Sequence, residues 1–139
     1  MTDAISTAVS RLTVEEGFRS TVYKDTLGNE TIGYGFCVSA GMSKSVAAAC
    51  LLAQVQDIYT AVKSAWWWHE DEPVRGSVII DVAFNVGVAG LLHFPKMLAA
   101  YGSKDWPTAS AQLLDSDAAR LLPNRYNPLA AILLNGVPS

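Results

Sequence analysis

The sequence predicts an α+β fold, with a small N-terminal lobe that contains a β-hairpin, a long bridging helix and a larger, all-helical C-terminal lobe. Apolar residues recur at helical spacing near the N-terminus and through most of the second half of the chain. Between these regions, two short β-type runs flank a polar loop with turn residues. The 139 residues suffice for one domain, whose lobes we expect at about 14–45 and 66–139.

The first helix is expected at residues 3–15. Its apolar residues lie three or four positions apart, which places them on one face: Ala4, Ile5, Ala8, Val9 and Leu12. Thr2 or Asp3 can cap the N-terminus of this helix. Gly17 lies just beyond its end, where a helix favours glycine.

The hairpin is expected from the runs 21–23 and 31–34, which are rich in β-branched and aromatic residues. The loop between them contains Gly28-Asn29, which is typical of a tight turn. Residues 36–38 have a composition that suits a third strand. This part of the chain is therefore predicted to form a small antiparallel sheet.

The bridging helix is expected at 43–65, beginning at Ser43. At about 1.5 Å per residue it would be roughly 30 Å long, which is enough to connect two lobes. The remainder of the chain is predicted to be helical, at 73–86, at 95–102, after Asp105, and at 124–134, where Pro128 is expected to interrupt the helix.

Composition excludes several classes of protein. Half of the residues are hydrophobic and 17% are charged, which is typical of a globular chain. The net charge is −3 and no cluster of Lys and Arg occurs, so no nucleic-acid partner is expected. The longest apolar stretches, 46–53 and 129–134, are too short to span a bilayer, so no transmembrane segment is expected. The N-terminus does not resemble a signal peptide, so export would require another protein.

The cysteines and histidines do not suggest a metal site. Cys37 and Cys50 lack the spacing of a zinc site and have no histidine nearby, and His69 and His93 lie far apart in the sequence. We expect two buried, reduced thiols, while a bridge between them stays open if the protein works outside the inner membrane. No metal and no cofactor is expected.

Three polar residues form the candidate catalytic site: Glu16 at the end of the first helix, Asp25 in the hairpin loop and Thr31 on the returning strand. Glycoside hydrolysis needs one protonated and one ionised carboxyl group. Partial burial after an apolar helix face would favour the protonated form of Glu16, and a polar turn beside Lys24 would keep Asp25 ionised. The hydroxyl of Thr31 can hold a water. By spacing alone, solvated or capping acidic residues are the commoner explanation, and Glu15 is a decoy on another face of the helix.

The segment from Glu16 to Gly35 resembles the active-site segment of the bacteriophage lysozymes of the T-even kind, glycoside hydrolase family 24. The family pattern is a Glu, eight residues, an Asp, five residues, a Thr and then Ile-Gly-x-Gly, and every position matches here. The resemblance implies an α+β lysozyme-like fold with two lobes joined by a long helix. It also implies hydrolysis of the β-1,4 bond between N-acetylmuramic acid and N-acetylglucosamine, without metal or cofactor.

The resemblance continues more loosely towards residue 126. The stretch 83–87 is similar to an aromatic, amide, apolar, glycine segment of the family, which implies that Asn85 binds sugar. Pro123-Asn124-Arg125 is similar to a stretch whose arginine approaches the catalytic Glu from the far lobe. With Tyr34 of the Gly-x-Gly motif, Asn85 and Arg125 are the expected substrate-binding residues. The family often has His where Phe36 stands, and its C-terminal helix continues past the position of Pro128.

Two further groups of residues are notable: the three consecutive tryptophans and the acidic residues after them. Trp66-Trp67-Trp68 is either a platform for sugar or membrane, or a helix end packed into the core, and we favour burial of at least one of the three. The acidic residues 70–72 are expected to form a charge cluster ahead of the helix that begins near Pro73.

The function expected from these observations is that of a phage endolysin, a muramidase that lyses the host cell by an inverting acid/base mechanism. It would be a monomer, made in the host cytoplasm, and would act on glycan strands of the periplasmic wall after release or from the virion. A lytic transglycosylase is the second possibility, although Asp25 and Thr31 argue against it because that chemistry needs no carboxylate to handle water. An inactive wall-binding protein is the third.

Overall fold

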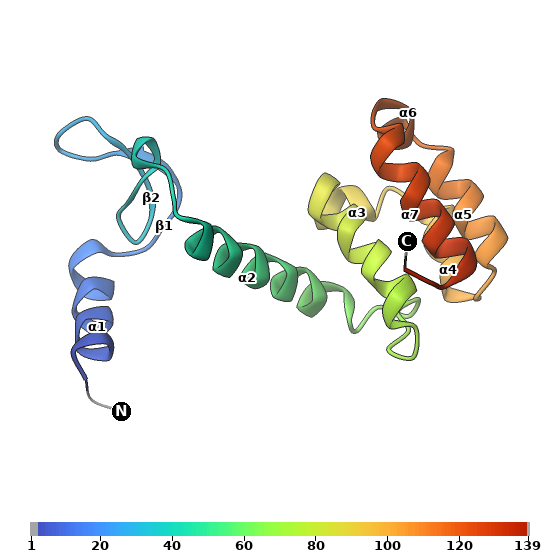
Figure 1. The fold of residues 1–139 in the computed structure, drawn as a ribbon, viewed down its shortest axis with the longest axis horizontal. Helices are drawn as coiled ribbons and strands as arrows, with labels where there is room; N and C mark the ends of the chain where they lie inside the picture. The colour runs from blue at the N-terminus through green and yellow to red at the C-terminus, as the bar shows by residue number, and fades with distance from the viewer. Residues whose placement is uncertain (1–2, 139) are drawn as a thin grey trace. The chain divides into compact units, whose positions relative to one another are not determined.

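The computed structural model describes residues 3–138. The chain divides into two compact units, Met1–Ala47 and Ala48–Ser139. The N-terminal unit contains a helix and a three-stranded sheet, and the C-terminal unit is helical (Figure 1). The fold class is therefore α+β, as predicted.

Helix α1 spans Ala4–Glu16 and has well-defined ends. Asp3 is its N-cap: the Asp3 carboxylate accepts from the backbone N–H of Ser6, and the Ser6 hydroxyl accepts from the backbone N–H of Asp3. Gly17 ends the helix at φ +65°, and its N–H donates to the carbonyl of Thr13. Both predicted ends are confirmed within one residue, and Thr2 lies outside the described residues.

The sheet consists of β1 (Arg19–Lys24), β2 (Glu30–Gly33) and β3 (Phe36–Cys37), in the order β1-β2-β3 with antiparallel pairing. The predicted third strand is present. Strand β2 is central, so Thr31 pairs with Tyr23 on one side and with Cys37 on the other. A short 3-10 helix, η1 (Val38–Ala40), follows the sheet.

Helix α2 (Lys44–Val62) begins at the end of the N-terminal unit and continues into the C-terminal unit. It corresponds to the helix predicted at 43–65 and ends three residues earlier, because the chain turns after the buried Val62. Within residues 3–138, α2 and α3 (Pro73–Leu91) are long and apolar enough to cross a bilayer by length and composition. Core helices pass the same test, and α3 contributes much of the core, so this finding does not show a transmembrane segment.

The core of the molecule lies in the C-terminal unit. Here α3 is joined by α4 (Pro95–Gly102), α5 (Trp106–Leu114), α6 (Asp117–Leu121) and α7 (Pro123–Asn135). Helix α5 packs against both α4 and α7, and α7 also packs against α3 (Figure 1). The largest side chains with almost no exposed surface all belong to this unit: Tyr101, Tyr126, Ile79, Leu91, Met97, Leu113 and Leu133.

The C-terminal unit differs from the predictions in one helix end and in one additional helix. The helix predicted at 73–86 continues to Leu91 as two helical segments that meet at Gly87, whose φ of +81° suits glycine. The short α6 was not predicted, because five residues are too few for a periodic pattern. Ser116 caps α6 by accepting from the N–H of Ala119.

The predicted interruption at Pro128 is wrong, because α7 is continuous from Pro123 to Asn135. A proline at this position removes one donor, the one that would reach the carbonyl of Asn124 in the first turn. The buried residues that follow in the helix, Leu129, Ala130 and Leu133, offset that loss.

The C-terminal end of α7 is held by Arg75 of α3. Its Nε donates to the carbonyl of Leu133 at 2.8 Å, and its Nη2 donates to the carbonyl of Leu134 at 3.0 Å. The guanidinium also lies over the ring of Trp106, 4.2 Å from the ring centroid. Arg75 therefore supplies donors to carbonyls that the end of the helix leaves unpaired.

The three tryptophans have different surroundings. Trp67 is 5% exposed and packs edge-on against Tyr101, whereas Trp66 is 73% exposed. Trp68 is half-buried and donates from Nε1 to Glu70 at 2.7 Å. The expectation that at least one of them lies in the core is confirmed.

The acidic residues 70–72 and the two cysteines differ in part from the expectations. The acidic residues 70–72 do not act as one cluster, because each pairs separately: Glu70 with Tyr59, Asp71 with Lys104 and Glu72 with Arg75. Both cysteines are free thiols. The expected burial of these thiols is wrong, since Cys37 on the edge strand β3 is half-buried and Cys50 on α2 is exposed.

Candidate active site

The three predicted catalytic residues all belong to the N-terminal unit. Glu16 is the last residue of α1, Asp25 directly follows β1, and Thr31 lies on β2. Each position is set by local structure, namely a helix end, a hairpin loop and a central strand. The structure thus places the members of the motif on neighbouring elements of one small unit.

Glu16 lies against the turn between β2 and β3. A Cβ atom at Gly35 would lie only 2.7 Å from Cδ of Glu16, so any side chain at position 35 would collide with the carboxyl group. Gly35 also has a φ of +78°, which few residues other than glycine adopt. The second glycine of the Ile-Gly-x-Gly motif therefore makes room for the candidate acid.

Glu15 and Glu16 have different surroundings, because successive helical residues point about 100° apart. Glu15 forms an exposed ion pair with Arg11, one turn earlier on α1, with a distance of 3.7 Å between Nε and Oε1. Glu16 is exposed as well, so the partial burial suggested by the sequence does not arise in the N-terminal unit.

Asp25 is held by the loop that follows it. Its Oδ1 accepts from the backbone N–H groups of Leu27 and Asn29, each at 2.9 Å. The side-chain amide of Asn29 donates to Oδ2 at 3.5 Å. The hydrogen bond from the backbone of Asn29, with smaller contributions from Leu27 and the Asn29 amide, holds the pKa of Asp25 below its usual range. Asp25 is therefore ionised near neutral pH, although loop amides and not Lys24 are the cause.

Thr31 is 4% exposed, in the middle of the sheet. Its Oγ1 donates to the backbone carbonyl of Asn29 at 3.2 Å. The same carbonyl accepts from the N–H of Asp25 at 2.9 Å. Asn29 was not singled out by sequence reasoning, although the Gly28-Asn29 turn signal pointed to its position.

Two aromatic residues are also present in this unit. Tyr34, a predicted substrate-binding residue, is 44% exposed, and its ring lies 5.5 Å from that of Phe18 between centroids. Phe36, which stands where the family often has His, has its ring close to Gly33. Tyr34 thus presents an open ring on the same unit as Glu16 and Asp25.

The other two predicted substrate-binding residues lie in the C-terminal unit. Asn85 on α3 accepts at Oδ1 from the hydroxyl of the buried Tyr126, at 2.6 Å. Arg125 on α7 donates from Nη2 to Oδ1 of Asp81 at 2.8 Å. Sequence reasoning missed Tyr126 and Asp81, because their partners lie 41 and 44 positions away. The expected approach of Arg125 to Glu16 stays a prediction.

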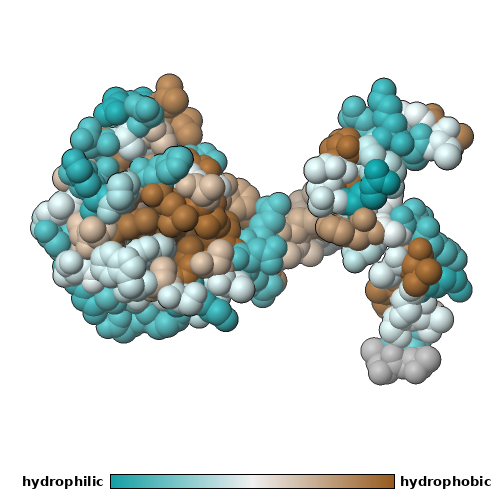
Figure 2. Space-filling view, turned by 180° about the vertical axis from the view of Figure 1, so that it is seen from behind, coloured by the Kyte–Doolittle hydropathy of each residue, from teal (hydrophilic) through white to brown (hydrophobic). Residues whose placement is uncertain are grey.

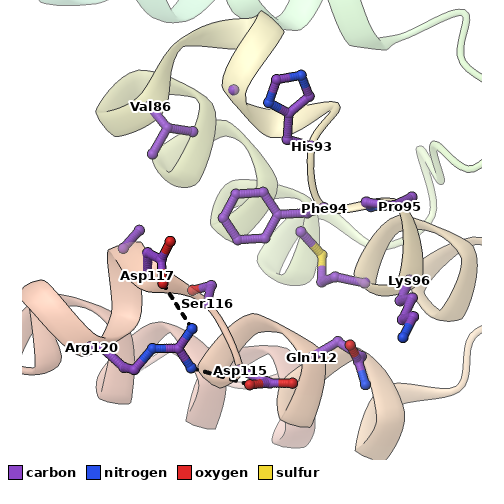
Figure 3. Close-up of a pocket in the computed structure, with 13 residues that line it drawn as sticks. Val86, His93, Phe94, Pro95, Lys96, Gln112, Asp115, Ser116, Asp117 and Arg120 are labelled. Carbon is purple, nitrogen blue, oxygen red and sulfur yellow. Dashed lines mark hydrogen bonds and ion pairs between the residues drawn. The ribbon is translucent and has the colours of Figure 1, made fainter.

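Depressions in the C-terminal unit adjoin some of these residues. One, of about 340 Å³, is lined by Asp81, Phe84 and Arg125, among others. A second, of about 500 Å³, is formed by the end of α3, the start of α4 and the α5–α6 connection (Figure 3). Its Arg120 is paired with Asp115 and Asp117, as Figure 3 shows.

Apolar residues are gathered on one face of the C-terminal unit, with hydrophilic residues around them (Figure 2). Exposed apolar side chains in this unit include Phe84 and Leu92.

Within residues 3–138, no group of three or more His, Cys, Asp or Glu side chains is placed to hold a metal ion. Glu16, Asp25 and Thr31 give the N-terminal unit two candidate carboxyl groups and a hydroxyl.

Comparison with known proteins shows which family the chain belongs to. The family model for phage lysozyme matches residues 13–121, which include Glu16, Asp25, Thr31 and Asn85. The chain is also similar to a protein from Dictyostelium discoideum described as probable T4-type lysozyme 1. The two are 23% identical over 163 residues, which cover 95% of this chain and 96% of that protein. Because the family model covers most of the sequence, the chain belongs to the phage lysozyme family, a family of lysozyme-type peptidoglycan hydrolases.

Proposed function

We propose that this protein is a muramidase, which hydrolyses the β-1,4 bond between N-acetylmuramic acid and N-acetylglucosamine in peptidoglycan. The observation that carries the proposal is the pair formed by Glu16 and the ionised Asp25 in one unit, within the stretch that the family model matches. Glycosidases of this kind need an acid and a base in unlike surroundings. Here Asp25 is held by three donors, while Glu16 lies over Gly35.

In the proposed reaction Glu16 donates its proton to the glycosidic oxygen, and the C–O bond to that oxygen breaks. Asp25 takes a proton from a water, whose oxygen forms the new bond to the anomeric carbon. Thr31 holds this water. The products are two shorter glycans, and both carboxyl groups return to their starting states through exchange of protons with solvent.

Each unit contains residues that are proposed to bind substrate. Tyr126 occupies Oδ1 of Asn85, which leaves the Nδ2 protons of Asn85 to donate to a carbonyl oxygen such as that of an N-acetyl group. Tyr34 offers an exposed ring, on which a sugar face can pack. Arg125 has Nε and Nη1 unbonded within residues 3–138, so these donors are open to an anionic group.

The biological setting follows from the same proposal. A phage endolysin would be made in the host cytoplasm and would reach the periplasmic wall after release, or it would act from the virion. The second candidate is a lytic transglycosylase, which forms an anhydro sugar without water. The conformation in which Asp25 is held ionised favours hydrolysis, because a transglycosylase has no use for a base that activates water.

The test is lysis of Gram-negative cells whose outer membrane has been stripped. The purified protein should clear the suspension, and Glu16→Gln should lower the rate by roughly 10²–10⁴-fold, because a general acid is lost. Glu15→Gln is the matched control, since Glu15 pairs with Arg11 and should keep most activity. A folded Glu16→Gln variant with near-native activity would contradict the proposal. Mass spectrometry of the released muropeptides separates the two enzyme classes, because a transglycosylase leaves anhydro-muramic ends.

A further inference from the structure

Asn29 is bonded to both residues that are proposed to handle the water. Its backbone N–H and side-chain amide donate to the two oxygens of Asp25, at 2.9 and 3.5 Å. Its carbonyl accepts from the N–H of Asp25 at 2.9 Å and from the hydroxyl of Thr31 at 3.2 Å. Every polar group of Asn29 except the oxygen of its side-chain amide is therefore engaged with one of these two residues.

The two oxygens of Asp25 are held differently. Oδ1 accepts two backbone N–H groups at 2.9 Å, from Leu27 and Asn29, which occupy its lone pairs and fix the side-chain rotamer. Oδ2 has one long contact, with the Asn29 amide at 3.5 Å. Oδ2 is therefore the oxygen that remains able to accept a proton from water, and the Asn29 amide lies beside it.

The hydroxyl of Thr31 is also oriented. Because its proton points to the carbonyl of Asn29, the hydroxyl can only accept a hydrogen bond from a water. A water that donates one proton to Thr31 and the other to Oδ2 of Asp25 keeps its lone pairs free for attack on the anomeric carbon. A hydroxyl free to rotate could instead donate to the water and occupy one of those lone pairs.

We propose that Asn29 is a positioning residue of this reaction, which makes Thr31 an acceptor towards the attacking water and uses its side-chain amide to hold Oδ2 of Asp25 as the base. This inference rests on the proposed hydrolase function. It adds a residue outside the Glu, Asp and Thr of the family pattern, and it assigns separate roles to the two oxygens of Asp25.

Other charged and titratable groups lie near Asp25. Lys24 and Glu30 pair across the ends of β1 and β2 on either side of the loop, and Cys37 lies on β3 opposite Thr31. Hydrogen bonds from Ser39 and Ala40 lower the pKa of the Cys37 thiol, and the negative charge of Asp25 opposes this shift weakly, so the two groups interact. A test of Asn29 must therefore leave these side chains unchanged.

The experiment compares Asn29→Ala with Thr26→Ala, two truncations in the same loop. Thr26 is exposed and lies next to Asp25, but its side chain does not take part in this network. On soluble glycan fragments, Asn29→Ala should lower kcat roughly three- to tenfold with little change in KM, because the lost contact serves the reaction and not binding. Thr26→Ala should match the wild type. Asn29→Asp, which keeps the shape but replaces the donor with a negative charge, should lower kcat further.

A ¹³C NMR titration of the Asp25 carboxyl separates positioning from a general loss of structure. Loss of the amide donor should raise the pKa of Asp25 in Asn29→Ala, and the added charge should raise it more in Asn29→Asp. Because a base must be ionised, the acid limb of the kcat profile should move to higher pH in the same order.

The Asn29 variants test the role of Asn29, whereas the activity of the wild-type protein tests the proposed function. An unchanged kcat and an unchanged Asp25 pKa in folded Asn29→Ala, while Glu16→Gln abolishes activity, would overturn only the role of the Asn29 side-chain amide, because the backbone carbonyl that binds Thr31 remains in this variant. If Asn29→Ala does not fold, kcat and the Asp25 pKa of Asn29→Asp provide the test of the Asn29 amide instead. Wild-type protein that releases no muropeptides would instead remove the proposed function.

Discussion

The hydroxyl of Tyr126 on α7 donates to Oδ1 of Asn85 on α3 at 2.6 Å. Tyr126 is completely buried, and burial raises the pKa of its hydroxyl, so the donor stays protonated over the working range of a wall hydrolase. Asn85 is half-buried at the surface of the same unit. Tyr126 thus determines which end of the Asn85 amide is available to a ligand.

Tyr126→Phe should weaken substrate binding while leaving the chemical step intact. Without the hydroxyl, the Asn85 amide is free to turn its carbonyl outward, so we expect KM to rise roughly fivefold with kcat nearly unchanged, as the loss of a hydrogen bond of about 1 kcal/mol implies. Steady-state kinetics on glycan fragments measure this. An unaltered KM would mean that Asn85 does not bind sugar through Nδ2.

Tyr101→Phe should not lower stability, in contrast to Tyr126→Phe. The hydroxyl of Tyr101 is buried and has no hydrogen-bond partner within residues 3–138, whereas the hydroxyl of Tyr126 has one. Removing an unsatisfied buried hydroxyl should leave the free energy of unfolding unchanged or raise it by up to about 1 kcal/mol, while Tyr126→Phe should lower it by about 1 kcal/mol. Urea unfolding of the two variants gives both values, and a clear loss of stability in Tyr101→Phe would show that its hydroxyl has a partner.

The stereochemistry of the product tests the role of Asp25. If Asp25 acts as a base on water, the carboxyl groups of Glu16 and Asp25 must stand about 6.5–9.5 Å apart in the complex, rather than the roughly 5–5.5 Å of a retaining enzyme. The first-formed reducing end should then be the α anomer. Proton NMR at early times, before mutarotation, measures it. A β anomer would instead make Asp25 a covalent nucleophile.

Much of the N-terminal unit was predictable because its determinants are local. Asp3 and Gly17 mark the ends of α1 through hydrogen bonds to residues three or four positions away. The turn residues between β1 and β2 bring Lys24 opposite Glu30, and the spacing from Asp25 to Thr31 follows from that turn. Interactions of such short range are visible as patterns in the sequence itself.

Long-range packing determines features of the fold that local sequence patterns leave ambiguous. Trp66 and Trp67 are identical in type and adjacent in sequence, yet one is 73% and the other 5% exposed, because only Trp67 points to Tyr101. By local rules Pro128 should interrupt α7. The helix is nevertheless continuous, because buried residues follow Pro128 and Arg75 donates to carbonyls at the C-terminal end. Here long-range burial outweighs a local penalty.

The sequence by itself predicted the α+β class and the hairpin, which the structure confirms, and it supplied Glu16, Asp25 and Thr31 as candidates, since each depends on neighbours within about twenty positions. Only the tertiary structure showed that Tyr126 orients Asn85, that Asp81 pairs with Arg125, and that Asn29 rather than Lys24 holds Asp25. The first two contacts join residues more than forty positions apart, at 41 and 44, and the third depends on which atoms of a short loop face inward. Hydrogen bonds are directional and short-ranged, so their partners follow from atomic positions, which periodicity and composition do not specify.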